Sequence, residues 1–183
     1  METDDVRGTE RHCMCRSEPF RAGGVNVPVN LAEVLFYHLQ RRPLDDVLPA
    51  LVEKTIERGW RAVIQAGSPE RLEALDQLLW TFREGSFIPH GTAKAGNATL
   101  QPVFLTNGDE NPNRADVRFM VDGARVDDVG CQLRGYTRVV VMFDGNDADE
   151  RDQARSAWKA VKAAGAEATY WQQGDGGRWE KKA

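Results

Sequence analysis

The chain has 183 residues and a mass of 20.4 kDa, enough for one domain with a hydrophobic core. Its 41% hydrophobic and 28% charged residues are typical of a globular protein and exclude a fibrous or low-complexity chain. The formal net charge of -4 argues against broad binding of nucleic acid, which requires a basic surplus. A local basic patch remains possible, although direct contact with DNA is not expected.

The sequence shows no targeting signal and no regular cysteine pattern. No apolar run is as long as a membrane span, and residues 1–5 lack the basic and apolar start of a signal peptide. We expect a cytoplasmic protein with no membrane contact. Cys13, Cys15 and Cys131 have no regular spacing, which argues against a disulfide scaffold. His12 lies beside the first two, but no second Cys/His pair follows, so no metal is predicted.

The two ends of the chain differ from its middle. Residues 1–29 carry charge, Gly23-Gly24 and prolines without a sustained hydrophobic period, and they are predicted to be a disordered extension. Since the first regular element begins immediately afterwards, a further hypothesis is that this segment is not part of the native product. The folded domain is predicted to span residues 30–173. The Gly-rich, charged residues 174–183 are predicted to form a flexible tail, from which Trp179 could fold back.

Strand and helix patterns alternate over the first half of the domain. Residues 34–39 are a nearly continuous apolar run, typical of a strand buried on both faces of a parallel sheet. A helical spacing of apolar residues begins after Pro43, and Gly59 marks its end. Residues 61–66 repeat the strand pattern. Ser68-Pro69-Glu70 then supplies an N-cap, a proline at the first helical position and an early acid for a helix running to about residue 80.

The second half continues in the same way. Further strands are predicted at residues 102–106, 117–121 and 138–144. Asp147 opens a helix that Gly165 ends, and residues 168–172 form a last strand. Such alternation predicts right-handed crossovers. The sequence therefore predicts a single three-layer α/β domain, a mostly parallel twisted sheet with helices on both faces and a nucleotide-binding-like topology.

The loops after the predicted strands lack a phosphate cradle. The first strand runs into Gln40-Arg41-Arg42-Pro43, which contains no glycine, and no G-x-x-x-x-G-K-[ST] motif occurs. Residues 91–96 faintly resemble such a motif but precede a strand instead of a helix. No nucleotide site is predicted. A small nucleotide- or phosphate-handling α/β enzyme remains the alternative function.

Catalytic and metal-binding patterns are weak. His38 is interpreted as a core or edge imidazole, and no G-x-S-x-G elbow occurs. The acids at Asp122, Asp127-Asp128 and Asp147-Asp149-Glu150 could gather a divalent ion, although acids in such places more often belong to a helix start or a loop. No spacing assembles a nucleophile, a base and an orienting group. The sequence predicts neither catalysis nor a cofactor.

A first candidate interaction surface lies where the helix ending near residue 80 meets its loop. The apolar stripe of this helix consists of Leu72, Leu75, Leu78, Leu79 and Phe82. Trp80 points away from that stripe, and Phe87, Ile88 and Pro89 follow within one loop. Such residues anchor protein interfaces when they are exposed. The alternative is a satellite cluster that covers the edge of the sheet.

A second candidate surface lies on the last helix. Its apolar stripe consists of Ala154, Ala157, Trp158 and Val161, and a basic row beside it consists of Arg151, Arg155, Lys159 and Lys162. A guanidinium next to an apolar ring suits a peptide carboxylate with a hydrophobic side chain, because bidentate hydrogen bonds fix the anion while the ring fills the pocket. The alternative is a solvated basic face.

The order of these motifs resembles the chi subunit of bacterial DNA polymerase III, a component of the clamp-loader assembly. The likeness runs from about Ala32 to Gln172. It is carried by Val34-Leu35-Phe36-Tyr37-His38-Leu39, Leu75-x-x-Leu78-Leu79-Trp80, Ser86-Phe87-Ile88-Pro89-His90 and Ala154-Arg155-x-x-Trp158-Lys159 with Gly165. Leu-Trp followed by Phe-Ile-Pro-His is its most specific part.

The resemblance implies a non-catalytic adaptor that links the clamp loader, through the psi subunit or its equivalent, to the acidic C-terminal tail of single-stranded DNA-binding protein. The surface facing psi, or a helicase in its place, would consist of Trp80, Phe87, Ile88 and Pro89. The tail would be received by Arg155 with Arg151, Trp158 and Lys159. The N-terminal extension and the acids of residues 144–147 depart from the family pattern. A psi-independent peptide-binding module is a further alternative.

Overall fold

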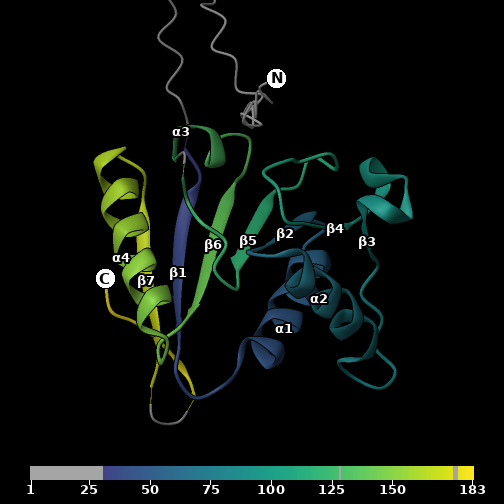
Figure 1. Ribbon diagram of the computed structural model, residues 1–183, viewed down its shortest axis with the longest axis horizontal. Coiled ribbons are helices and arrows are strands. Elements are labelled where there is room, and N and C mark those ends of the chain that lie inside the picture. The colour runs from purple at the N-terminus through teal and green to yellow at the C-terminus, as the bar shows by residue number, and fades with distance from the viewer. Residues whose placement is uncertain (1–30, 128, 175–176) are drawn as a thin grey trace, which may run out of the picture.

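One eight-stranded sheet organises the computed structural model, which describes residues 31–127, 129–174 and 177–183 (Figure 1). The strand order is β3-β4-β2-β5-β6-β1-β7-β8, and every neighbouring pair is parallel except β7 with β8. The predictions for residues 1–29, including the group of His12, Cys13 and Cys15, lie outside the described residues.

The strands occupy the following residues: β1 Glu33–Leu39, β2 Ala62–Ala66, β3 His90–Thr92, β4 Val103–Thr106, β5 Val117–Val121, β6 Arg138–Asp144, β7 Ala168–Gln173 and β8 Trp179–Lys181. The α-helices are α1 Leu44–Glu57, α2 Pro69–Thr81, α3 Val129–Gln132 and α4 Ala148–Ala163, and short 3-10 helices cover Ala93–Ala95 and Ala98–Leu100. The strands and long helices predicted from the sequence are all present, with ends shifted by a residue or so. β3 and β8 were not predicted.

Local signals account for the ends of the helices. The Ser68 side chain accepts a hydrogen bond from the backbone N–H of Arg71, so the predicted N-cap of α2 is confirmed. Gly59, with a φ of 76°, follows α1 and donates its N–H to the carbonyl of Ile56. At α4 the Asp147 carboxylate accepts the N–H groups of Asp149 and Glu150.

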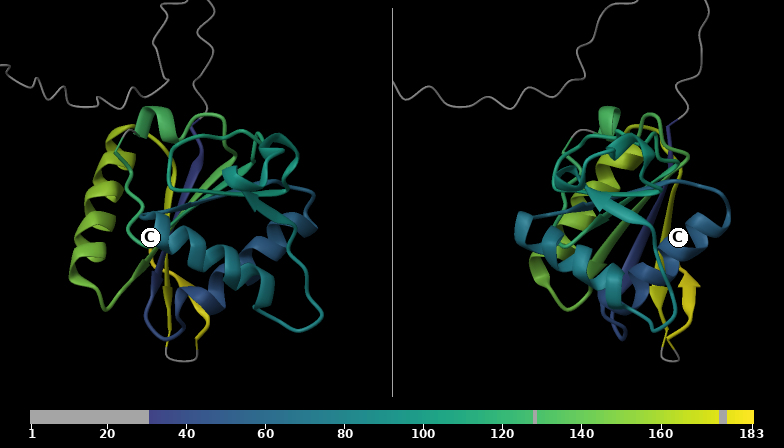
Figure 2. Two further views of the ribbon diagram at one scale, coloured as in Figure 1. Left: turned by 45° about the vertical axis from the view of Figure 1, so that its right-hand side comes forward. Right: turned by 90° about the vertical axis from the view of Figure 1, so that its right-hand side faces the viewer.

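Two hydrophobic cores lie on opposite faces of the sheet. Alternation along β1 sends Leu35 and Leu39 into the core beneath α1 and α2, and Val34 and Phe36 into the core beneath α4. In the left view of Figure 2, α4 lies on one side of the strands and α1 and α2 on the other. The predicted three-layer α/β fold with a mostly parallel sheet is confirmed. Burial on both faces explains why these strands are almost continuously apolar.

A buried arginine fixes the loop between β4 and β5. Arg118 is only 1% exposed. Its guanidinium donates to the carbonyls of Gly108 and Asp109, to the Gln65 side chain and to the Tyr136 hydroxyl, at 2.9–3.1 Å. These acceptors satisfy a charge that would otherwise be costly to bury. The turn-rich residues 107–113 are thereby tied to the sheet.

Within residues 177–183 the structure has a strand where the sequence predicted a flexible tail from which Trp179 could fold back. Trp179–Lys181 forms β8, which pairs with β7 and carries Trp179 edge-on against the Tyr37 ring at a centroid distance of 4.7 Å. Beyond β8, the N–H of Tyr170 donates to the Ala183 oxygen, and the N–H of Lys182 donates to the Tyr170 carbonyl, both at 2.9 Å. The strand has only three residues, and two of them are charged. It therefore shows no alternation of apolar and polar residues from which it could be predicted.

Replacing Trp179 should therefore destabilise the fold. A half-buried ring packed on Tyr37 is lost in Trp179→Ala, and the free energy of unfolding should fall by about 1–2 kcal/mol. Urea denaturation measures this loss. Lys181→Ala, an exposed change in the same strand, is the control. If Trp179→Ala were as stable as the unchanged protein, the packing of Trp179 on Tyr37 would contribute nothing to the stability of the fold.

Candidate functional site

A pocket lies between α4 and the sheet at β1 and β7, and we call it the α4 pocket. Its volume is about 440 Å³. Its walls include the aromatic rings of Phe36, Phe143, Trp158 and Tyr170, and its cationic groups belong to Arg151, Arg155 and Lys159. The structure thus brings all four residues of the second predicted surface, Arg151, Arg155, Trp158 and Lys159, to one hollow.

The packing of α4 decides this arrangement. Ala154, Ala157 and Val161 are buried against the sheet, and the Trp158 ring meets the Phe36 ring edge-on at 5.2 Å. Residues spaced by four lie on one side of a helix, so the basic row follows the margin of the buried stripe. The cationic side chains therefore stand beside an aromatic wall.

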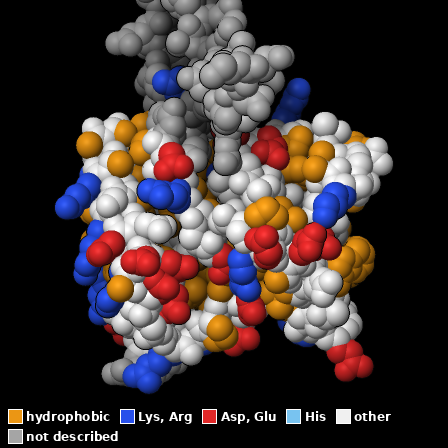
Figure 3. All heavy atoms as spheres, in the orientation of Figure 1, with side chains coloured by type: hydrophobic (Ala, Val, Ile, Leu, Met, Phe, Trp, Pro, Cys, Tyr) orange, Lys and Arg blue, Asp and Glu red, His pale blue; other side chains and the backbone are white. Residues whose placement is uncertain are grey.

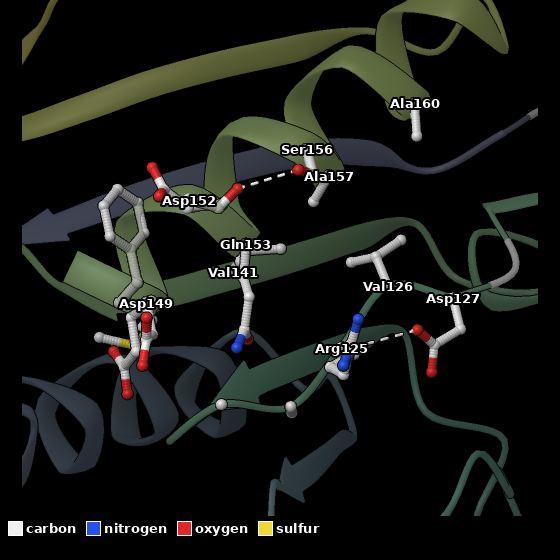
Figure 4. Close-up of a pocket in the computed structure, with 16 residues that line it drawn as sticks. Arg125, Val126, Asp127, Val141, Asp149, Asp152, Gln153, Ser156, Ala157 and Ala160 are labelled. Atoms are coloured by element: carbon white, nitrogen blue, oxygen red, sulfur yellow. Dashed lines mark hydrogen bonds and ion pairs between the residues drawn. The ribbon is translucent and has the colours of Figure 1, made fainter. Parts of the chain in front are cut away.

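The charges on α4 are separated by face. Figure 4 shows a second hollow, of about 540 Å³, between α4 and residues 123–127. Asp149 lines that hollow, together with the ion pair of Arg125 and Asp127 at 3.4 Å. Asp152 also lines it, but its carboxylate contacts Arg155 of the α4 pocket at 2.8 Å. In the space-filling view acidic side chains gather in this region, whereas Lys and Arg lie along the edge formed by α4 (Figure 3). Asp149 therefore lies away from the α4 pocket, whereas Asp152 lies at its margin beside Arg155.

The acidic loop between β6 and α4 also turns away from the α4 pocket. Asp144 accepts hydrogen bonds from Asn146, Asp147 caps α4, and both acids line a separate hollow at the carboxyl ends of β1 and β6. Glu150, whose pKa is raised by burial, accepts the N–H of Asp144. The departure of residues 144–147 from the family pattern does not place an acid in the α4 pocket.

Sequence reasoning did not name Phe36, His38, Phe143 or Tyr170 as site residues of the α4 pocket, and two of these, His38 and Tyr170, are polar. The His38 ring stacks on Phe143 at 5.1 Å, and its Nδ1 lies 2.7 Å from the Tyr170 hydroxyl. Burial lowers the pKa of His38, and the nearby Arg151 charge lowers it further. Burial raises the pKa of Tyr170, with Arg155 opposing the change. The one sequence signal was a polar residue within the apolar run of residues 34–39.

Trp80 and Phe87 form an exposed aromatic pair, which we call the Trp80–Phe87 surface. Trp80 is 56% exposed and Phe87 is 66% exposed, and their ring centroids are 5.6 Å apart. The buried His90 ring lies 5.0 Å from Trp80 and is fixed by the carbonyls of Ile88 and Asp76, at 2.6 and 3.2 Å. Pro89 is half-buried. The pair therefore rests on a rigid base.

The structure corrects the placement of Ile88 on this surface. Ile88 is 1% exposed and belongs to the core beneath α1 and α2, together with Leu79. In extended backbone successive side chains point to opposite sides, so Phe87 facing solvent sends Ile88 inward. The satellite-cluster alternative thus applies to Ile88 and not to its exposed neighbours.

The carboxyl ends of β1, β5 and β6, where a nucleotide would bind in such a sheet, are crossed by ion pairs. Arg71 contacts Asp122 at 2.9 Å and Asp45 at 3.7 Å. Residues 91–96 run from β3 into a three-residue 3-10 helix. Among the described residues there is no group of three His, Cys, Asp or Glu side chains arranged to hold a metal ion. Nor does the described part of the chain contain a helix long and apolar enough to cross a membrane.

The fold and the two surfaces define a class: a nucleotide-binding-like α/β domain that carries aromatic and basic surfaces in place of a phosphate loop. The chain belongs to the DNA polymerase III chi subunit family, since the family model described as DNA polymerase III chi subunit, HolC, matches residues 31–169. It is also similar to the "Probable DNA polymerase III subunit chi" of Rickettsia prowazekii (strain Madrid E). The two are 27% identical over 111 residues, or 59% of this chain and 67% of that protein.

Family membership excludes one of the alternatives drawn from the sequence. The chi family is a non-catalytic subunit of DNA polymerase III, so this chain has an accessory role in DNA replication. The small phosphate-handling enzyme is thereby set aside.

Stability measurements should separate the exposed pair from the residue buried beside it. Ile88→Ala should cost about 2–4 kcal/mol because it empties a core position, whereas Trp80→Ala and Phe87→Ala should each cost less than about 1 kcal/mol. Urea denaturation of the three variants tests this order. A loss in Trp80→Ala as large as that in Ile88→Ala would mean that the tryptophan ring belongs to the core.

Proposed function

We propose that this protein is an adaptor of the DNA polymerase III holoenzyme. The α4 pocket receives the acidic C-terminal tail of single-stranded DNA-binding protein, and the Trp80–Phe87 surface holds the psi subunit or its equivalent in the clamp loader. The observation that carries the proposal is the meeting of Arg151, Arg155 and Lys159 with an aromatic wall in one pocket. Family membership supplies the setting in replication.

The α4 pocket fits the end of an acidic peptide. The terminal residue of a peptide carries its carboxylate and its side chain on the same Cα, so a site for it needs a cation and an apolar wall close together. Arg155 and Trp158 supply these two elements. Arg155 now contacts Asp152 at 2.8 Å, but both side chains are more than two-thirds exposed. An ion pair so open to water is weak and exchanges readily for a ligand carboxylate.

The local charge is what attracts the tail, because the whole chain is acidic. A net charge of -4 would repel an acidic peptide at long range, whereas the basic row of α4 attracts it within about 8 Å, the screening length at physiological salt. Asp149 lines the other hollow. Asp152 is the acid beside Arg155, and its exposed ion pair is the one that a ligand carboxylate would replace.

The two surfaces lie near opposite edges of the sheet. α2, which carries Trp80, packs on β2, β3 and β4, whereas α4 packs on β6 and β7. Two partners can therefore be held at once, as an adaptor requires. Large exposed rings on a rigid base are typical of interface hot spots, which supports a protein partner at the Trp80–Phe87 surface. A helicase using the same surface would compete with psi.

Binding of a tail peptide tests the α4 pocket. A labelled peptide copying the last residues of the organism's own single-stranded DNA-binding protein should bind, and Arg155→Ala should weaken it about tenfold or more. Arg125→Ala, the same loss of charge beside the other hollow, should bind normally. Added salt should weaken binding, and so should removal of the last peptide residue. No detectable binding, or equal binding by Arg155→Ala, would reject the pocket as the tail site.

Partner capture tests the Trp80–Phe87 surface. Trp80→Ala and Phe87→Ala should each lose most of the psi subunit, or its equivalent, in pull-downs from the organism's own extract, because hot-spot rings dominate interface energy. Both variants should still bind the tail peptide. Leu100→Ala removes another exposed apolar side chain, 69% exposed, and serves as the matched control. Undiminished capture by both aromatic variants would exclude this surface.

A further inference from the structure

The pair of His38 and Tyr170 lies inside the α4 pocket but has no role in the binding scheme so far. Both side chains line the pocket, and the Tyr170 hydroxyl lies 2.7 Å from His38 Nδ1. One of the two atoms must donate the hydrogen in this bond. Which of them donates determines where the hydroxyl hydrogen of Tyr170 points.

The surroundings of the other imidazole nitrogen settle the direction of this bond. His38 Nε2 is buried and has no hydrogen-bond partner in the described residues. It packs directly on Gly145, where even an added Cβ would collide with it. A hydrogen on Nε2 would enter this crowded contact as an orphaned buried donor, which proteins avoid more strictly than an orphaned acceptor. The single proton of neutral His38 therefore belongs on Nδ1.

A proton on Nδ1 makes His38 the donor to Tyr170. The phenol oxygen then accepts from His38, and its own hydrogen remains available for a second bond. Backbone bonds to Lys182 and Ala183 hold Tyr170 in place from the edge of the sheet, and its ring meets Trp158 edge-on at 6.1 Å. Tyr170 and Arg155 line the same pocket. Burial raises the pKa of Tyr170, and the charge of Arg155 opposes that change.

We infer that Tyr170 is a specificity-determining residue of the α4 pocket. Its hydroxyl donates a hydrogen bond to the terminal carboxylate of the bound peptide, beside Arg155, and His38 is the positioning residue that keeps the hydroxyl hydrogen available. This role rests on the proposed function of the pocket.

The chemistry of a carboxylate explains why a neutral donor matters there. A guanidinium attracts any anion, including an acidic side chain further along the peptide. Two carboxylate oxygens offer about four acceptor sites, so a fixed hydroxyl can bind beside the arginine. Its position near the aromatic wall selects the carboxylate whose own side chain fills the pocket. Tyr170 would thus favour a peptide end over an internal acid.

A thermodynamic cycle over the protein and the peptide tests this role. The tail peptide is compared with the same peptide amidated at its terminus, on the full-length protein and on Tyr170→Phe. Tyr170→Phe should weaken the free-acid peptide about tenfold and the amidated peptide less than about twofold. Equal weakening of both would assign Tyr170 to packing, and no weakening of either would remove it from the site. Either result overturns the inference.

Variants of His38 test the positioning step. No single substitution removes the N–H donor and keeps all of the packing of the imidazole, so two changes are compared. His38→Phe keeps a ring on Phe143 but leaves the Tyr170 hydroxyl free to rotate, so the preference for the free acid should fall by less than it does in Tyr170→Phe. His38→Asn returns an N–H near the Nδ1 position and should recover part of that preference. Nitrogen-15 NMR of the unchanged protein should place the His38 proton on Nδ1, and a proton on Nε2 would overturn the inference.

The outcomes separate this role from the function on which it rests. Failure of the unchanged protein to bind the tail peptide would reject the proposed function and this role together. In the other outcome the unchanged protein binds the tail peptide, Arg155→Ala weakens that binding, and Tyr170→Phe keeps the preference for the free acid. That outcome would reject the role of Tyr170 alone.

Discussion

Burial of the sheet on both faces is the constraint on which the rest of this structure depends. β1 lies between β6 and β7, and its side chains alternate between the two cores, so each face needs a helical cover. α4 covers one face through its alanines and Val161, and Trp158 meets Phe36 from β1. The same packing fixes the rotation of α4 about its axis. That rotation brings Arg151, Arg155 and Lys159 to one hollow and Asp149 to another.

The arrangement keeps the two candidate surfaces apart. α2 and the segment after it sit toward the β3 edge, where Trp80 and Phe87 are exposed over the buried His90 and Ile88. α4 sits toward the β7 edge, where β8 and the last residues back the pocket through Tyr170. A rigid sheet between two surfaces keeps their distance constant, which suits a subunit that joins two parts of an assembly.

Much of this could be predicted because it depends on local order. The strand runs, the Ser68 cap and the off-stripe position of Trp80 are properties of neighbouring residues, and the structure agrees with them. Ile88 was misplaced because the direction of a side chain in a loop depends on what packs beneath it. β8 was not predicted because it is stabilised by Tyr37 and β7, which are separate segments of the chain.

By itself, the sequence determined the α/β class, the order along the chain of the long helices and of the strands other than β3 and β8, the apolar stripes and the basic row of α4, since each is a periodic pattern within one segment. The tertiary structure alone decided which rings wall the α4 pocket, that His38 meets Tyr170 across 132 residues, and which acids face elsewhere. These are contacts between segments distant in the chain. They follow from the order of the strands within the sheet and from the rotation of each helix about its axis. Only the packing of the two cores fixes these.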